Sequence, residues 1–462
     1  MNTNHATPSG SVFASVSRND THGPGARRRF FIALCAAGML LFFAAAAGWT
    51  VGSGWLAFGL TYGLLAAGAI GWVADTYSGT LAGIKNHGTY HLGVQTRKWP
   101  AWLLGLLLTA FYVSYYWWPQ YLQGVTRLAD PLSQLLRHAP ADHWFLYGYL
   151  YTVAVLVMGV RMILRYRHNR YEMIRTATLM FVQLGVAFLL PSILRQLNQP
   201  DFYFSYFWPL QPKYLYPGEI QKLIQHPGGL GTFMVVWGAT ATFIATPILT
   251  YFYGQRWYCS WVCGCGGLAE TAGDPFRHLA DSSQKAWKFE RWSIHSVLVI
   301  VTLGTALLWI NDATGGEALG PASYWFRKSY GFFVASILAG LVGVAAYPVW
   351  GSRIWCRFAC PMAAILGIFQ RYFSRFRITT NGSQCISCGN CTTYCEMGID
   401  VRAYAQQGAN IVRASCVGCG VCAAVCPRGV LKLENGATFA DRFPGAEQPF
   451  AELKRSLGVS ER

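Results

Sequence analysis

Residues 385–395 read CISCGNCTTYC, and residues 416–427 read CVGCGVCAAVCP. Both runs follow the order C-x2-C-x2-C-x3-C, and the second ends in a Cys-Pro pair. Three thiolates at this spacing can bind one iron–sulfur cube, and the fourth cysteine of each run then binds the other cube. The pattern therefore predicts two [4Fe–4S] clusters with crossed ligand sets. The first set is Cys385, Cys388, Cys391 and Cys426, and the second is Cys416, Cys419, Cys422 and Cys395.

Structural zinc and disulfide bonds are the alternative interpretations of these cysteines. Zinc sites usually present two separated C-x2-C pairs, and a disulfide framework has no reason to duplicate this spacing. The chain departs from the bacterial pattern at Glu396, which follows Cys395 where the pattern has proline. We expect this difference to change a turn rather than a ligand.

Most of the chain before these runs has the composition of a membrane protein. Hydrophobic residues make up 53% of the 462 residues, charged residues only 12%, and the mean hydropathy is +0.27. A soluble protein has about 25% charged residues. The net charge is +17, but the basic residues lie between apolar runs, so the charge does not indicate nucleic acid as a partner. Fourteen cysteines, most of them at cluster-type spacing, favour reduced thiolates facing the cytoplasm.

Eight segments are long and apolar enough to span a hydrocarbon core, which needs about 20 residues. They lie at about 30–48, 53–73, 100–118, 144–162, 177–194, 229–251, 292–310 and 331–349. The N-terminal tail and the loops on its side hold about 22 Lys and Arg, and the opposite loops hold about 7. The positive-inside rule therefore predicts a multi-pass protein with both termini in the cytoplasm.

The predicted organisation is an α-helical polytopic membrane protein with a small C-terminal α+β ferredoxin-like domain. A cytoplasmic tail (1–29) precedes a transmembrane domain (30–370), a 2[4Fe–4S] ferredoxin-like domain (371–435) and a C-terminal tail (436–462). The ferredoxin-like domain is too short to build a large hydrophobic core, so we expect bound clusters to hold it folded.

A second pair of cysteine motifs lies within the membrane domain. Residues 254–263 read GQRWYCSWVC and residues 351–360 read GSRIWCRFAC, so glycine, arginine, an aromatic residue and both cysteines repeat at an offset of 97. A C-x3-C pair on a helix places both sulfurs on one face. Two copies would supply four thiolates for one iron–sulfur or copper centre at the membrane boundary, from Cys259, Cys263, Cys356 and Cys360.

Other interpretations of these motifs stay open. Cysteine is also a common small apolar residue in helices, and the isolated Cys35 fits that description. Arg256 and Arg353, which precede the two cysteine pairs, would either offset the charge of a thiolate-bound centre or act as positive-inside anchors.

The two C-x3-C motifs followed by the double four-cysteine run resemble the NosR/NapH-type membrane iron–sulfur proteins. One motif ends in Cys360-Pro361, and the segments DPLS (130–133) and RHNRY (167–171) extend the resemblance over roughly residues 100–430. The resemblance implies an electron carrier of the bacterial cytoplasmic membrane that serves periplasmic reductases or their maturation. The large flavin-binding domain of the longer NosR members is not expected, because the first apolar run begins near residue 30.

The first motif departs from this family pattern. It continues into Gly264 where the second motif has proline, and a third cysteine, Cys265, follows. Cys265 does not share a helical face with Cys259 and Cys263. It would be a spare ligand, an exchanged ligand or no ligand.

The predicted function is electron transfer, as a component of an oxidoreductase system rather than a stand-alone enzyme. Electrons would pass between a cytoplasmic or quinol source and a separate flavin-bearing or haem-bearing partner. The chain has no P-loop, dinucleotide-binding motif or nucleophile elbow. The alternative is a copper-handling or respiratory-enzyme assembly factor that resembles the CcoG-type proteins.

Overall fold

The computed structural model describes residues 25–49, 52–78 and 96–435; most of the expected N-terminal tail (1–24) and the expected C-terminal tail (436–462) lie outside these ranges. The predicted α-helical polytopic architecture is confirmed. Within the described residues, seven helical segments are long and apolar enough to cross a membrane, where eight were predicted. They are Ala26–Ala46, Gly54–Tyr77, His143–Arg165, Arg170–Gln196, Leu230–Tyr253, Gln284–Ala313 and Pro321–Ala345.

Four of these segments are single α-helices, and three change to π-helical geometry along their length. The single helices are α2 (Ala26–Ala46), α3 (Gly54–Ser78), α7 (His143–Arg165) and α15 (Gln284–Ala313). The others are α8 (Arg170–Phe181) with η3 (Val182–Leu189) and α9 (Leu190–Gln196), α11 (Leu230–Thr240) with η5 (Ala241–Ala245) and α12 (Thr246–Tyr253), and α16 (Pro321–Tyr330) with η7 (Gly331–Ala345).

Each π-helical segment ends two or three residues before a proline. Pro191, Pro247 and Pro348 follow η3, η5 and η7 in this way. Proline has no N–H to donate, and its ring clashes with the carbonyl four residues earlier. A wider turn before the proline relieves that clash and keeps the helix continuous.

The third predicted span is the helix α4 (Trp99–Trp117), which is not among the seven. Its tryptophans and tyrosines lower its hydropathy. It nevertheless packs antiparallel along the last spanning segment. The Trp117 ring contacts the Phe332 ring at its far end, and the position of Gly105 faces the carbonyl of Ala345 at its near end.

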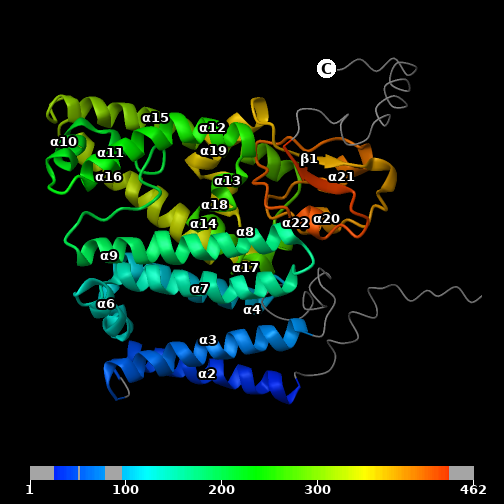
Figure 1. Ribbon diagram of the computed structural model, residues 1–462, viewed down its shortest axis with the longest axis horizontal. Helices are drawn as coiled ribbons and strands as arrows, with labels where there is room; N and C mark the ends of the chain where they lie inside the picture. The colour runs from blue at the N-terminus through cyan, green and yellow to red at the C-terminus, as the bar shows by residue number, and fades with distance from the viewer. Residues whose placement is uncertain (1–24, 50–51, 79–95, 436–462) are drawn as a thin grey trace, which may run out of the picture.

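The long helices lie side by side, and the C-terminal module sits at one end of the bundle (Figure 1). An ion pair of 2.9 Å joins Arg28 at the start of α2 to Asp75 near the end of α3. Arg167, just after α7, donates to the carbonyl of Tyr77 in α3, and Arg165 donates to the Tyr394 hydroxyl of the C-terminal module. The start of α2 therefore lies at the end of the bundle that carries the module.

Short helices connect the long ones at both ends. At the end away from the module they are η2 (Pro119–Leu122), α5 (Gln123–Leu128), α6 (Asp130–Arg137), η4 (Pro212–Leu215) and α10 (Pro217–Gln225). Near the module they are α13 (Arg256–Cys259), α14 (Gly264–Glu270), η6 (Asp274–Leu279), α17 (Tyr347–Trp350), α18 (Ile354–Phe358) and α19 (Pro361–Tyr372).

The C-terminal module contains one two-stranded sheet and three short α-helices. Strand β1 (Arg377–Thr380) pairs antiparallel with β2 (Leu431–Glu434), and Ile378 lies opposite Leu433. The remaining elements are η8 (Gly382–Gln384), α20 (Asn390–Thr393), α21 (Val401–Gln407) and α22 (Val421–Ala424).

The backbone of the module repeats at an offset of 31 residues. Ser387 and Gly418 both have positive φ, at 56° and 64°, and Gly389 and Gly420 follow them at 78° and 88°. Serine occupies the exposed copy of the first position. The buried copy needs glycine, because a Cβ on Gly418 would lie 2.7 Å from the Cβ of Arg256.

The module shares one hydrophobic core with the end of the bundle. Buried residues of the membrane motifs pack in the same cluster as Phe376, Ile378 and Val417 of the module. Packing against the bundle therefore stabilises the module, in addition to any contribution from bound clusters.

Candidate metal centres

The structure groups the eight C-terminal cysteines in the crossed arrangement predicted from their spacing. One cavity is lined by Cys385, Cys388, Cys391 and Cys426. A second cavity is lined by Cys395, Cys416, Cys419 and Cys422. All eight thiols are free, and most other residues that line each cavity are apolar, with Arg402 and Arg428 at the first and Glu396 at the second. Four convergent thiols in a mainly apolar cavity suit a [4Fe–4S] cluster.

The two membrane motifs have equivalent backbone structures. Cys263 and Cys360 donate their backbone N–H groups to the carbonyls five residues earlier, at 2.7 and 2.9 Å. Each precedes a new helix, α14 or α19. The prediction that each pair lies along one continuous helix is wrong. The first helix of each motif ends before the second cysteine, and the next helix begins directly after that cysteine, at Gly264 or Pro361.

The four thiols of these motifs converge. Burial raises the pKa of Cys259, and the neighbouring thiols of Cys263, Cys356 and Cys360 raise it further. Among the described residues, no three cysteines have sulfurs within 4.8 Å of one another. One tetrahedral metal ion bound through sulfur would hold its ligands about 4 Å apart.

Cys265 lies beside these four cysteines and lines a cavity that is distinct from the two cavities of the module. A hydrogen bond with Cys265 is the main cause that lowers the pKa of Cys263 to about 7. Cys265 itself is exposed and lines a cavity of about 550 Å³ that extends between α7 and η3. The third cysteine therefore connects the membrane motif to an open space.

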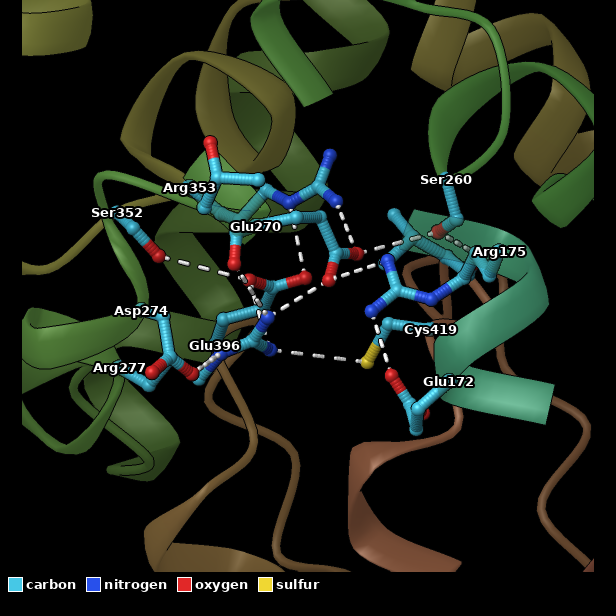
Figure 2. A network of polar contacts seen from close by, with 12 residues as sticks. Glu172, Arg175, Ser260, Glu270, Asp274, Arg277, Ser352, Arg353, Glu396 and Cys419 are labelled. Carbon is cyan, nitrogen blue, oxygen red and sulfur yellow. Dashed lines mark hydrogen bonds and ion pairs between the residues drawn. The ribbon is translucent and has the colours of Figure 1, made fainter. Parts of the chain in front are cut away.

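A buried network of arginines and carboxylates lies beside Cys419 of the module (Figure 2). Its arginines are Arg161, Arg165, Arg175, Arg277 and Arg353, and its acids are Glu172, Glu270, Asp274 and Glu396. All nine side chains are at least nine-tenths buried. Removing one member of such a network would leave buried charges without a partner.

Arg353 and Arg277 link this network to both groups of cysteines. Arg353 donates to Cys356 Sγ at 3.6 Å and pairs with Glu396 at 2.9 Å. Glu396 also pairs with Arg277 at 3.0 Å, and Arg277 lies 3.9 Å from Cys419 Sγ. A continuous chain of polar contacts thus connects a membrane cysteine to a module cysteine.

Glu270 lies at the centre of the network. Its carboxylate pairs with Arg175, Arg277 and Arg353 at 2.6–2.7 Å. Burial by itself would raise the pKa of this carboxyl, but the three guanidinium groups outweigh that effect and hold the pKa well below its usual range. Glu270 is therefore ionised at neutral pH.

The two arginines predicted to offset thiolate charge have different surroundings. Arg353 contacts Cys356 as described, which fits the predicted role. Arg256 instead donates to Asn435 at 2.8 Å and stacks over the Phe376 ring at 4.6 Å. Arg256 therefore contacts the C-terminal module, and the structure shows no contact between its guanidinium and a sulfur within the described residues.

Glu396 and the other network acids were not recognised from the sequence. Glu396 was expected only to alter a turn, but its carboxylate lies in the ion-pair network. The available signal was the scarcity of acidic residues: the chain has only 20, and Glu270 and Asp274 lie just after a cysteine motif. Charged residues in such positions are expensive unless they are paired.

Comparison with known families defines the class of the protein. A 4Fe-4S dicluster domain model matches residues 384–431, which include all eight C-terminal cysteines. A 4Fe-4S binding domain model matches residues 235–281 and 330–380, so each match contains one C-x3-C motif. These matches support two [4Fe–4S] clusters and a membrane iron–sulfur role in electron transfer.

Individual relatives are also named as electron-transport or ferredoxin-type proteins. The chain is 29% identical over 157 residues to the Putative electron transport protein YccM of Escherichia coli (strain K12), covering 32% of this chain and 43% of the relative. It is 28% identical over 163 residues to the Methylamine utilization ferredoxin-type protein MauN of Methylobacillus flagellatus, covering 34% and 55%. The chain thus spans about half the length of the curated relatives it matches. These relatives are consistent with the NosR/NapH-type resemblance but do not name that family. No solved structure matches significantly.

We expect Asp274→Asn to destabilise the protein by about 3–5 kcal/mol, because it leaves buried arginines without their carboxylate. Asp274 contacts Arg161, Arg165 and Arg277. Burial would raise the pKa of Asp274, but these arginines lower it below its usual value. The stabilisation is therefore complete above the unfolded pKa of about 3.9 and is lost only as the pH falls through the folded pKa.

Thermal unfolding from pH 5 to 8 would check this prediction. The difference between the wild-type protein and Asp274→Asn should stay constant over this range. The exposed Asp201→Asn variant should match the wild type. A difference that disappears between pH 8 and 5 would contradict the lowered pKa.

Proposed function

We propose that the protein transfers electrons between the two clusters of its C-terminal module and a third [4Fe–4S] cluster bound by Cys259, Cys263, Cys356 and Cys360. The observation that carries the proposal is the buried chain of contacts from Cys356 through Arg353, Glu396 and Arg277 to Cys419. It holds the two groups of thiols in a fixed relation and excludes water between them.

The residues of the chain have separate roles in this proposal. The eight module cysteines, in their crossed sets, would bind two clusters, which supply one-electron redox chemistry when present. Arg353 and Arg277 would stabilise the negative charge of thiolate-bound clusters, because each donates towards a cysteine sulfur. Glu270 and Glu396 keep these arginines in place. The protein would thus be an electron-transfer component rather than a stand-alone enzyme.

We further propose that the protein lies in the bacterial cytoplasmic membrane with both termini in the cytoplasm. Six arginines counted in the positive-inside analysis are buried in ion pairs, namely Arg161, Arg165, Arg175, Arg277, Arg353 and Arg357. On the other side, Arg137 is buried and paired with Asp142. Without these seven arginines, the module side holds about 16 Lys and Arg and the opposite side about 6. This difference still favours the module side as cytoplasmic.

A membrane quinol is a candidate electron source, and the cavity beside Cys265 supports it. Aromatic side chains such as Phe145 and Phe188 line this cavity together with Arg137. At the inner end, Gln183 and Tyr151 accompany Cys265, and the Tyr151 hydroxyl is buried without a hydrogen-bond partner among the described residues. Such a site suits an apolar ring with polar oxygens. A separate flavin-bearing or haem-bearing protein would be the partner at the other end of the route.

Anaerobic purification followed by iron, sulfide and copper analysis tests the proposed third cluster. Three clusters of four irons predict about twelve irons and twelve sulfides per chain. EPR spectroscopy of the reduced protein should then show interacting clusters. About eight irons with no further centre would contradict the membrane cluster. Eight irons together with copper would favour the alternative role as a copper-handling or assembly factor.

A further inference from the structure

A basic cavity of about 360 Å³ lies between the bundle and the C-terminal module, apart from the cysteine cavities of the module. Its arginines come from four elements of the chain: Arg291 from α15, Arg357 from α18, Arg371 from α19, and Arg413 from the loop before Cys416. Elements distant in sequence therefore bring four guanidinium groups to one space.

The charge of this cavity is poorly compensated. Glu290 is the one carboxylate among its lining residues, and it is already paired with Arg357 at 2.6 Å. Arg291 and Arg413 lie against the Trp287 ring, at 5.4 and 5.3 Å from its centre, rather than against an acid. The cavity thus presents a surplus of positive charge to whatever occupies it.

The cavity lies at the end of the spanning segments that carries the C-terminal module. The first turns of α15 line the cavity, and the apolar part of this helix follows them in the sequence. Trp292 and Phe289 on the same turns are 79% and 62% exposed, and Phe373 at the end of α19 is 61% exposed. Tryptophan is enriched at the interface between water and lipid, so the exposed Trp292 favours a position of this part of α15 near that interface.

We propose that this cavity binds the phosphate group of an anionic ligand. Guanidinium groups match phosphate oxygens in geometry and charge, and basic pockets between membrane helices at this level suit phospholipid headgroups. A free phosphate compound offers the same chemistry. Cys356 also lines the cavity, so the bound anion would lie beside the membrane cysteines. The binding site does not depend on the proposed electron route.

The test uses delipidated holoprotein in detergent, titrated with phosphatidylglycerol, with zwitterionic phosphatidylcholine, or with inorganic phosphate. Native mass spectrometry would count bound lipid, and calorimetry would follow inorganic phosphate. We expect the Arg371→Gln/Arg413→Gln variant to bind the phosphate ligand at least about tenfold more weakly, because it loses two charge-assisted contacts. Val412→Glu, which adds a carboxylate at an exposed lining position, should weaken binding independently.

The matched control is Arg170→Gln/Lys432→Gln, which removes two exposed basic residues that do not line the cavity. Absorbance of the clusters would verify that each variant is folded. Preferential binding of phosphatidylglycerol that is lost in the cavity variants supports the site and indicates that its ligand is a lipid headgroup. Binding of inorganic phosphate but not of lipid, again lost in the cavity variants, supports the site and indicates that its ligand is a soluble phosphate compound. Equal weakening in the cavity and control variants, or no phosphate binding by the wild type, would overturn the proposal.

Discussion

Cys356→Ser is expected to lower the iron content from about twelve to about eight per chain, because it removes one ligand of the proposed membrane cluster. Cys356 is 6% exposed and receives a contact from Arg353 at 3.6 Å. The loss leaves that arginine without its sulfur partner, but the eight module cysteines are untouched. The visible absorbance of two clusters should therefore remain, and electron transfer through the membrane motif should stop.

Cys35→Ser is the matched control for this experiment. Its thiol lies between α2 and α3, with Sγ 3.8 Å from the carbonyl of Leu65, and it takes no part in either cysteine group. Its iron content should equal that of the wild type. If Cys356→Ser and the wild type both hold about eight irons, the membrane cysteines bind no cluster. Copper that is present in the wild type and lost in Cys356→Ser, with iron unchanged, would favour the copper-handling alternative.

Glu270→Gln is expected to weaken the attachment of the C-terminal module by about 3–5 kcal/mol. Glu270 forms ion pairs with Arg175, Arg277 and Arg353 at the same time. A neutral amide of the same shape fills the space but leaves these buried guanidinium groups with too little negative charge. Because two of the three arginines also contact Glu396 of the module, the loss should loosen the module from the bundle.

Urea unfolding followed by cluster absorbance would measure this effect, and limited proteolysis between residues 371 and 377 would report detachment. The control Glu317→Gln changes an exposed acid in the loop before α16 and should alter stability by no more than about 0.5 kcal/mol. An unchanged urea midpoint for Glu270→Gln would show that the network does not hold the module.

The local patterns of the chain allowed several features to be predicted. Cluster ligands such as Cys385 and Cys388 lie close in sequence, so their spacing by itself indicates the chemistry. Apolar length identified the seven spanning segments of the described residues, and also α4, whose tryptophans and tyrosines place its hydropathy near the limit. The offset of 97 residues between Cys259 and Cys356 indicated that two motifs would meet. Each of these signals is local or repeated, and no knowledge of packing is needed to find it.

The break inside each C-x3-C motif was not predictable in the same way. A spacing of four residues suggests one helical face, yet the chain turns between Cys259 and Cys263 so that a new helix begins at Gly264. Only the second motif carries a local signal for this turn, because Pro361 favours the first position of a new helix.

By itself, the sequence determined the cofactor class, the helical membrane architecture and the repeated cysteine motifs, because these depend on residue type and spacing. Only the tertiary structure decided which charges meet. Glu396, Glu270 and Arg353 are separated by 43 residues or more, and an isolated acid or arginine carries no sign of its partner. A buried charge is costly without a partner and is tolerated within an ion pair. The role of each of these residues therefore depends on the folded structure that brings them together.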